Sequence, residues 1–476
     1  MVIKVPSTAS RHIINRFSYG YTPALRSAVA KAGGGREWFT DQLAHTKVVD
    51  TKADAMKAWF PYLRSSSRIR QAVDRDGRRN QWELSMDLVR WTILRRMSSN
   101  RQLFETMVDF WSNLLHVPAF GDGWMFRASY DATIRRHALG KFSDLLVGAT
   151  MHPAMMVFLD SARSTRQSVN ENHGRELLEL HTVGVGAGYS EAEVLSSARI
   201  LTGYHVETWQ PAAQVYHPDR HWTGPVKVLG FKSSNSDRDG RALMRRYLRY
   251  LAAHPATATR LARRLCQRFV SDTPSASIVR GVARAYTKSG TDIKATLRAL
   301  VTHPDFARSV DDKVRTPAQD AIATYRALGV KVKPPTRDGD FGYAANYVLN
   351  DMGEAPFMWP APNGFPEVGT AWAAAGRMRS SWDMHHVATG GWWPSAGMSR
   401  KAPRNYLPAG RVRLDAAVDA VSRTLLGRKA TAAQVKAAAA LVQMQPSTVI
   451  ERESFGDWRA IPLISAVLNS PEHLRK

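Results

Sequence analysis

Apolar residues recur three and four positions apart along most of the chain. Between Trp82 and Met97 they include Leu84, Leu88 and Trp91, a spacing that places them on one face of a helix. Ser190 and Glu193 form a capping box, which predicts the start of another helix. Similar helical patterns cover residues 101–115, 237–310, 314–355, 412–443 and 457–476. We therefore predict an all-α protein with one large core.

Two kinds of segment depart from this pattern. Residues 204–232 contain the only convincing strands, and Gln214–Tyr216 could pair with Val226–Leu229 as a small β hairpin or flap near 214–230. Residues 356–372 are rich in Pro, Gly and aromatic side chains, which neither helix nor strand tolerates, so we predict a long ordered loop there. We expect a main helical domain at 1–410 and a C-terminal helical segment at 411–476 packed on it.

The densest polar chemistry lies between Asn170 and Thr182. On a helical wheel, Asn172, Arg175, Glu176 and Glu179 fall on one stripe of this segment. Flanking segments are apolar, and unpaired buried charge is costly, so this polar stripe requires either partners or a function.

Three interpretations of this stripe are open. Glu176 and Glu179 are about one helical turn apart, so their carboxylates can serve acid/base catalysis or bind a divalent metal. Glu171, Arg175 and Glu179 are spaced four apart, which also suits a structural ladder of ion pairs. His181 can join the two glutamates only if the helix ends near Leu180, and the glycines from Gly184 onward permit an early end.

Other candidates surround the stripe in the sequence. His217, Asp219 and His221 alternate, so an extended segment would place them on one face as metal ligands, although Pro218 favours a loop. Aromatic residues of the predicted loop offer faces for stacking on sugars or bases, or form a plug packed on the helices. The candidate substrate-binding residues are Asn113, Arg135, His137, Asn170, Asn172, Arg175, Trp359, Asn363 and Trp372.

Charge and cysteine content narrow the function classes. The 476 residues include 66 Lys and Arg against 41 Asp and Glu, a net charge of +25 that attracts polyanions. The densest basic run, Arg68 to Arg79, is interrupted by Asp74 and Asp76, so a solvated basic surface is the simpler interpretation. The single cysteine, Cys266, excludes an internal disulfide. No apolar signal region or membrane-spanning run is visible in the sequence.

Several blocks, taken together, resemble the bacterial family called domain of unknown function 1800. They are Phe110-Trp111 with Asn113, Ile134–Gly140, His152–Met155 with Leu159-Asp160, Asn170–Gly184, Ala198–Gly203, Phe269–Pro274, Met352–Trp372 and Ser470–Glu472. The resemblance covers nearly the whole chain. It implies a mostly helical fold, frequent export, and a neighbouring sulfatase-like family, domain of unknown function 1501, as a partner. No established reaction comes with it.

From these observations we expect an exported or envelope-associated enzyme that acts on a polymeric or polyanionic substrate. Glu176 would be the acid/base, and Glu179 would tune its pKa or share a divalent metal. Arg135, Asn172 and His181 would position the substrate. The alternative is a non-catalytic binding or assembly partner of the sulfatase-like protein, and a third is a nucleic-acid-binding protein. Export is favoured slightly over a cytoplasmic location.

Overall fold

The computed structural model describes residues 3–209, 211–336 and 339–476, and most of these residues are helical. The predicted all-α fold class is confirmed. Regular β structure within these ranges is limited to short two-stranded ladders. In the described part of the chain, no helix combines the length and apolarity needed to cross a membrane. Residues 1 and 2 of the expected main domain lie outside the described residues.

The α-helices follow one another along the chain as listed here. The first half comprises α1 (Thr8–Phe17), α2 (Pro23–Ala32), α3 (Gly35–Leu43), α4 (Thr51–Ala55), α5 (Ser67–Arg75), α6 (Gln81–Ser98), α7 (Gln102–Leu114), α8 (Arg127–His137), α9 (Phe142–Thr150), α10 (Pro153–Phe158), α11 (Asn172–Glu176) and α12 (Glu191–Ile200). The second half comprises α13 (Arg241–Ala253), α14 (Pro255–Phe269), α15 (Ala276–Lys288), α16 (Ile293–Thr302), α17 (Pro304–Arg308), α18 (Pro317–Ala327), α19 (Phe341–Asp351), α20 (Ala375–Gly390), α21 (Leu414–Leu426), α22 (Ala432–Leu441), α23 (Arg452–Leu468) and α24 (Pro471–Leu474).

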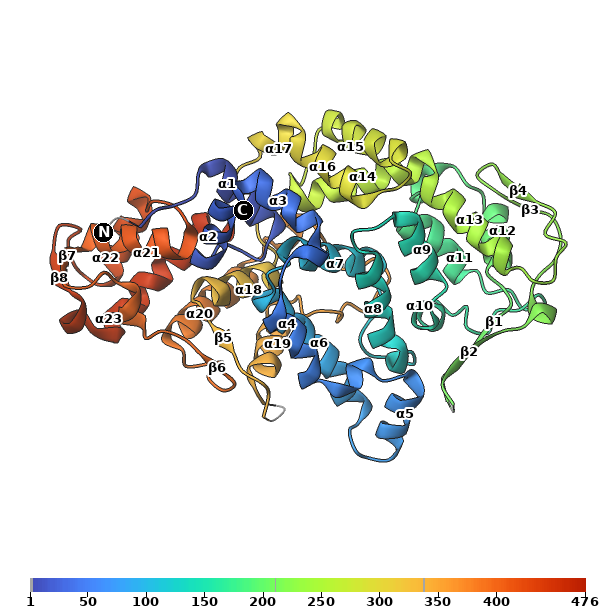
Figure 1. The fold of residues 1–476 in the computed structure, drawn as a ribbon, viewed down its shortest axis with the longest axis horizontal. Coiled ribbons are helices and arrows are strands. Elements are labelled where there is room, and N and C mark those ends of the chain that lie inside the picture. The colour runs from blue at the N-terminus through green and yellow to red at the C-terminus, as the bar shows by residue number, and fades with distance from the viewer. Residues whose placement is uncertain (1–2, 210, 337–338) are drawn as a thin grey trace.

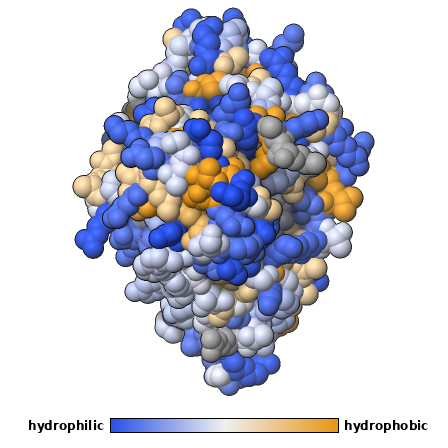
Figure 2. All heavy atoms as spheres, turned by 90° about the vertical axis from the view of Figure 1, so that its left-hand side faces the viewer, coloured by the Kyte–Doolittle hydropathy of each residue, from blue (hydrophilic) through white to orange (hydrophobic). Residues whose placement is uncertain are grey.

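The molecule is elongated (Figure 1). Helices α21, α22 and α23 lie at one end, and α12 and α13 lie at the other, with α6, α7 and α8 between them. Figure 2 views the molecule from the end that carries α21–α23 and shows mostly hydrophilic residues, among which hydrophobic residues form small groups. The long axis therefore separates the C-terminal helices from the segment that contains the polar stripe.

Buried apolar side chains form two clusters where we expected one core. The first extends from Ile13 to Phe306 and includes residues of α1–α3, α7–α10 and α12–α17. The second draws on α6 and α18–α23, so residues on both sides of position 410 share it. Buried charged side chains of α6, α7 and α14 meet at the boundary between the clusters, and their need for polar partners separates the apolar packing. The boundary at 410 remains a prediction.

The strands form four antiparallel pairs among the described residues. They are β1 (Tyr204–Glu207) with β2 (Ala213–Tyr216), β3 (Val226–Val228) with β4 (Phe231–Ser233), β5 (Lys331–Val332) with β6 (Met398–Ser399), and β7 (Arg411–Arg413) with β8 (Val449–Glu451). Both predicted strands near 214–230 exist, but the expected pairing of β2 with β3 is wrong. Leu229 and Gly230 both have positive φ, which closes β3 on β4 in a tight hairpin turn.

The capping box predicted at the start of α12 is confirmed. The Ser190 hydroxyl accepts from the Glu193 amide, and the Glu193 carboxylate accepts from the Ser190 amide. Helix α12 crosses α11 at Gly174, where an added Cβ would lie 2.6 Å from the backbone nitrogen of Ala198. A glycine is therefore required for these two helices to approach this closely, and this approach holds the polar stripe against the first core.

We predict that Gly174→Ala destabilises the protein by about 1–3 kcal/mol, because α11 and α12 must separate to admit the methyl group. The matched control is Gly376→Ala in α20, where an added Cβ meets nothing within 4 Å. That change should leave stability unchanged or raise it slightly. Urea unfolding of the two variants measures the difference, and equal stabilities would contradict the close-packing argument.

Candidate functional site

The polar stripe lies on α11 and on the π-helical turn that follows it, Leu177–His181. Arg175 pairs with Glu171 at 3.5 Å and with Glu179 at 3.7 Å. Its guanidinium also donates to Glu191 at the start of α12. The geometry thus contains the ion-pair ladder predicted from the spacing, with an added link between two helices.

Glu176 is the charged residue of the stripe that this ladder leaves out. Its side chain is half-buried, and no hydrogen bond or ion pair joins it to another described residue. Burial raises the pKa of Glu176 above its ordinary value, and the neighbouring carboxylate of Glu179 adds a smaller increase. The two carboxylates therefore differ. That of Glu179 is paired with Arg175, whereas that of Glu176 has no partner among the described residues and holds a proton more readily.

His181 ends the π-helical turn but is buried. Thr182 donates its hydroxyl to Leu177 O at 2.6 Å, and the Gly184 amide donates to Leu178 O at 2.9 Å, so the helix stops here as the sequence allowed. The His181 side chain is 1% exposed, and burial lowers its pKa to about 3. No contact among the described residues joins it to Glu176, so His181 belongs to the core side of the turn.

The two asparagines at the start of α11 are in contact with each other, and Asn172 also contacts Asp160, which follows α10. The Asn172 amide donates to the Asn170 side-chain oxygen at 2.9 Å, which fixes the start of the helix. The Asn172 side chain donates to Asp160 at 3.4 Å. Asp160 follows α10 and has positive φ. These contacts place Asp160 beside the first turn of α11, at the end of the stripe that leads to Glu176.

Asp160 also lines an open groove with about 1240 Å³ of empty space. The other lining residues include Trp124, Arg163 and Trp209. Trp209 is 75% exposed, which is unusual for so large an apolar side chain. The groove thus combines aromatic faces with charged groups of both signs next to the polar stripe.

Arg135 and His137 do not join the polar stripe in the structure. Arg135 pairs with Glu105 at 2.9 Å and Asp131 at 2.7 Å, and its guanidinium lies 4.4 Å from the centre of the Trp91 ring. These contacts engage Arg135 within the fold, and its Nη2 is buried without a hydrogen-bond partner among the described residues. His137 lies at the end of α8, where burial lowers its pKa. Neither residue contacts the stripe residues in the described part of the chain.

The aromatic loop at residues 356–372 closes on itself and on α7. Asn113 donates to Phe365 O at 2.8 Å and accepts from the Phe365 amide at 2.7 Å. The Trp359 indole donates to Asn363 at 2.7 Å, and the Trp372 indole donates to Pro366 O at 3.0 Å. The polar edges of these side chains are thus used within the loop, as expected for a plug packed on the helices.

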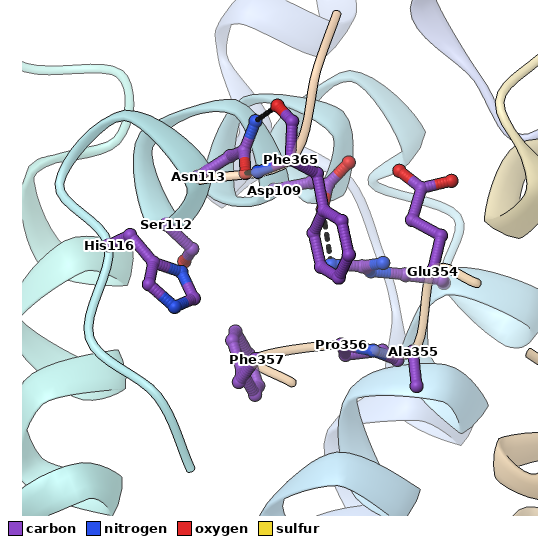
Figure 3. Close-up of a pocket in the computed structure, with 10 residues that line it drawn as sticks. Asp109, Ser112, Asn113, His116, Glu354, Ala355, Pro356, Phe357 and Phe365 are labelled. Atoms are coloured by element: carbon purple, nitrogen blue, oxygen red, sulfur yellow. Dashed lines mark hydrogen bonds and ion pairs between the residues drawn. The ribbon is translucent and has the colours of Figure 1, made fainter. Parts of the chain in front are cut away.

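A polar cavity lies between this loop and α6 and α7, with about 300 Å³ of empty space (Figure 3). Its lining includes Asp109, Ser112, Asn113 and His116 from α7 and the residues just after it, and Glu354 from the segment that precedes the loop. His116 contacts Trp359 O at 2.7 Å. Glu354 accepts from the Ala318 amide at 2.8 Å, and burial raises its pKa to about 7.

Arg268 joins the walls of this cavity. It pairs with Glu367 at 2.9 Å and with Asp109, which also pairs with Arg96. Burial alone would raise the pKa of Asp109, but the two guanidinium groups hold it below its usual value. We name Arg96, Asp109, Arg268 and Glu367 the central ion network. It links α6, α7, α14 and the aromatic loop.

The predicted metal segment does not remain extended. Pro218–Arg220 forms a 3-10 turn, in line with the loop that Pro218 favoured, so His217, Asp219 and His221 do not lie on one face of an extended segment. His221 is buried and contacts Asn235 at 3.0 Å, whereas Asp219 is exposed. Proline fixes φ and removes the amide donor, which favours the turn over a strand.

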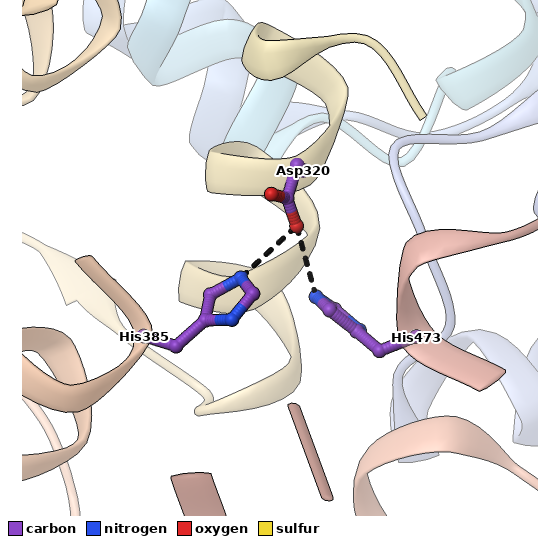
Figure 4. A group of neighbouring side chains, drawn as sticks. All are labelled: Asp320, His385 and His473. Carbon is purple, nitrogen blue, oxygen red and sulfur yellow. Dashed lines mark hydrogen bonds and ion pairs between the residues drawn. The ribbon is translucent and has the colours of Figure 1, made fainter. Parts of the chain in front are cut away.

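A different group of side chains has metal-ligand spacing. Asp320, His385 and His473 form the group of this kind found among the described residues, and all three are buried (Figure 4). They come from α18, α20 and α24. The sequence analysis missed them, as it missed Glu354 and Arg268, because each stands alone in an ordinary helical or loop pattern.

The densest basic run does not form a free basic face. Arg70 is buried and donates to Met125 O at 2.7 Å. Arg75 and Arg78 each pair with Asp76 at 3.2 Å, and Arg79 pairs with Asp87 at 2.8 Å. Three arginines of the run thus have carboxylate partners among the described residues.

We predict that Arg268→Met destabilises the protein by about 3–5 kcal/mol, because it leaves the buried carboxylates of Asp109 and Glu367 without their shared partner. Arg263→Met, on the exposed face of the same helix, is the control and should change stability by less than about 0.5 kcal/mol. Chemical denaturation measures both. Similar losses in the two variants would refute a special role for the central ion network.

Glu354 makes stability depend on pH. Its pKa is about 7 in the folded chain against 4.5 in the reference state, so the folded state holds the proton more tightly. Its stabilising contribution is therefore complete below about pH 4.5 and is lost as the pH rises through about 7. We predict that Glu354→Gln removes this loss, which raises stability at pH 8 relative to the unchanged chain by at most about 3 kcal/mol.

Thermal unfolding at pH 5 and pH 8 tests this prediction. Glu453→Gln is the control, because the Glu453 side chain is 64% exposed. The stability difference between Glu354→Gln and the unchanged chain should grow from pH 5 to pH 8, and the control should show no such growth. A difference that is independent of pH would contradict the assigned protonation.

Comparison with known proteins agrees with the resemblance found in the sequence. No significant match was found among curated proteins or among solved structures. The chain does match the family described as "Protein of unknown function (DUF1800)" over residues 12–475. This match includes the aromatic loop, the polar stripe, the central ion network and the Asp320 group. The chain therefore belongs to the DUF1800 family.

Proposed function

We propose that this protein is an enzyme that acts on a polymeric or polyanionic substrate by carboxylate acid/base chemistry, with Glu176 as the proton carrier. The observation that carries the proposal is the contrast between neighbouring carboxylates. Glu176 is half-buried, free of partners among the described residues and raised in pKa, whereas Glu179 is paired with Arg175. A pair of carboxylates in unlike environments is the usual arrangement for acid/base catalysis.

The stripe lies next to a surface suited to a chain-like substrate. Asn172 joins Asp160 at 3.4 Å, and Asp160 lines the open groove that also holds Trp124 and Trp209. Glu176 lies one helical turn beyond Asn172 on the same side of α11. Aromatic faces beside polar groups suit the flat faces and hydroxyl edges of sugars. The groove can therefore hold the polymer while its end or a side group meets Glu176.

The charge of the protein supports a polyanionic substrate. A net charge of +25 raises the local concentration of anionic polymers. Arg163 in the groove offers a specific contact for an anionic group. Because the Arg68–Arg79 run is largely paired within the protein, the attraction comes from the distributed charge and not from one basic patch. An acidic polysaccharide fits these features better than a nucleic-acid duplex.

In the proposed reaction, protonated Glu176 donates to the leaving oxygen of the substrate, and its carboxylate form then accepts a proton from the incoming water. Glu179, positioned by Arg175, disfavours a second negative charge at Glu176 and so helps it to hold the proton until it is needed. Glu179 thus acts on Glu176 through its negative charge and not through a hydrogen bond. Divalent metal at these two carboxylates remains a variant of the proposal, with Glu176 and Glu179 as ligands.

The alternative, a non-catalytic assembly partner of a sulfatase-like protein, is favoured by one observation. Arg175 ties Glu171, Glu179 and Glu191 together, so most of the stripe already serves the junction between α11 and α12. Under this alternative, Glu176 only completes a polar surface. A change at Glu176 would then alter complex formation or thermal stability and no chemical step.

We predict that Glu176→Gln abolishes cleavage of an acidic polysaccharide while leaving the unfolding temperature unchanged, because the amide keeps the shape but cannot donate the proton. The unchanged chain is first tested on a panel of uronic-acid and sulfated polysaccharides by the release of reducing ends. Glu171→Gln, on the same helix and half-exposed, is the control and should remain active. Full activity in Glu176→Gln would refute the assignment.

A further inference from the structure

Asp320, His385 and His473 meet in the interior where α18, α20 and α24 come together (Figure 4). His385 Nε2 lies 3.0 Å from Asp320 Oδ1, and His473 Nε2 lies 3.4 Å from the same oxygen. The side chains of Asp320 and His385 are fully buried, and that of His473 is 3% exposed. Nothing in the proposed reaction uses these three residues, so their convergence needs a separate explanation.

Their spacing is that of ligands around one ion. The three candidate ligand atoms all lie within 4.8 Å of one another. Around a tetrahedral Zn²⁺ ion with bonds of about 2.0–2.1 Å, neighbouring ligand atoms lie about 3.3–3.4 Å apart. Two imidazoles and a carboxylate are also a ligand set that divalent transition metals accept. Only small side-chain shifts would be needed to place an ion at the centre.

The carboxylate of Asp320 is held so that one oxygen faces the histidines. Its Oδ2 accepts from the Ser381 hydroxyl at 2.8 Å and from Arg377 Nη2 at 3.4 Å. This leaves Oδ1 for His385 and His473. Supporting hydrogen bonds to a ligating carboxylate are typical of metal sites, where they orient the ligand. The positive charge of Arg377 opposes a dication, so we expect weaker binding than at a site of four ligands.

His385 carries the clearest sign of a cation. Its Nδ1 lies 2.7 Å from Asn469 Oδ1, which accepts the Nδ1 proton. The other ring nitrogen, Nε2, lies 3.0 Å from Asp320 Oδ1. Two acceptors at this distance require a proton or a metal ion between them. Metal-binding histidines characteristically make this outer hydrogen bond to a carbonyl oxygen.

His473 makes a metal ion the better choice over a proton. Its Nε2 lies 3.4 Å from Asp320 Oδ1, the same oxygen that His385 faces. Its Nε2 also lies 2.9 Å from the Thr324 hydroxyl, which can donate to it or stand beside an ion. A proton joins two atoms, whereas three donor atoms converge here. One metal ion can satisfy all three together.

A small cavity borders the group. His473 lines it together with Tyr21, Arg315 and Glu472.

We propose that Asp320, His385 and His473 bind one divalent transition-metal ion, with Zn²⁺ as the reference ion. The site ties α24 to α18 and α20 and thereby stabilises the packing of the C-terminal helices in the second core. It is separate from Glu176 and does not depend on the proposed function. The ion is structural, because three buried ligands and one small cavity leave no room for a polymer.

Titration of the chelator-treated full chain with Co²⁺ and Zn²⁺ tests the site. We expect one Co²⁺ per chain with the visible absorption of a low-coordinate nitrogen and oxygen environment, displacement by Zn²⁺, and a higher unfolding temperature with Zn²⁺. His385→Gln and His473→Gln should abolish all three effects. His386→Gln changes the neighbouring exposed histidine and should retain them.

X-ray absorption of the Zn²⁺-loaded unchanged chain provides the measurement that does not depend on folding of the variants. We expect a first shell of nitrogen and oxygen with two imidazoles. The proposal is overturned if the unchanged chain binds no stoichiometric ion, if its spectrum lacks two imidazoles, or if His385→Gln and His473→Gln fold and bind like the unchanged chain. The first result would leave a proton between His385 and Asp320 as the bridging cation.

Discussion

The ion pairs of Arg268 with Asp109 and Glu367 are the interaction on which the arrangement of this protein depends. Arg268 belongs to the first apolar cluster through α14, and Arg96, which shares Asp109, belongs to α6 of the second. Charges buried at this depth must be paired in good geometry because desolvation is costly. The position of each cluster relative to the other is therefore set by polar contacts at their boundary, and apolar packing fills the space on both sides.

The aromatic loop depends on the same contacts. Glu367 lies within it, and Asn113 of α7 holds Phe365 through two hydrogen bonds. The tryptophan indoles then bond to the loop itself. A segment without helix or strand is ordered here because its polar groups find partners in side chains and in its own backbone. This arrangement also encloses Glu354, whose raised pKa follows from a wall that excludes most of the water.

In the polar stripe, helix spacing and tertiary packing together decide which side chains are buried, which are paired and which stay without a partner. Gly174 brings α11 against α12, and the π-helical turn ends the helix at His181. His173 and His181 face inward, and Arg175 binds carboxylates from two helices. Glu176 is left at the surface without a partner among the described residues. Glu171, which precedes the first residue of α11, is also a glutamate, but it is paired with Arg175. The raised pKa of Glu176 therefore comes from its surroundings and not from its residue type.

The sequence by itself determined the helical class, the capping box at Ser190 and the irregular loop, and its spacing allowed the ion-pair ladder as one of three arrangements. These features follow from neighbours within four residues, where spacing fixes contact. Only the tertiary structure decided the hairpin pairing, the burial of His181 and the meeting of Asp320 with His385 and His473. The Asp320 group joins residues that are far apart in the chain, and each of the three has an ordinary local pattern. Local spacing cannot decide burial or pairing, because both depend on how the whole core is assembled.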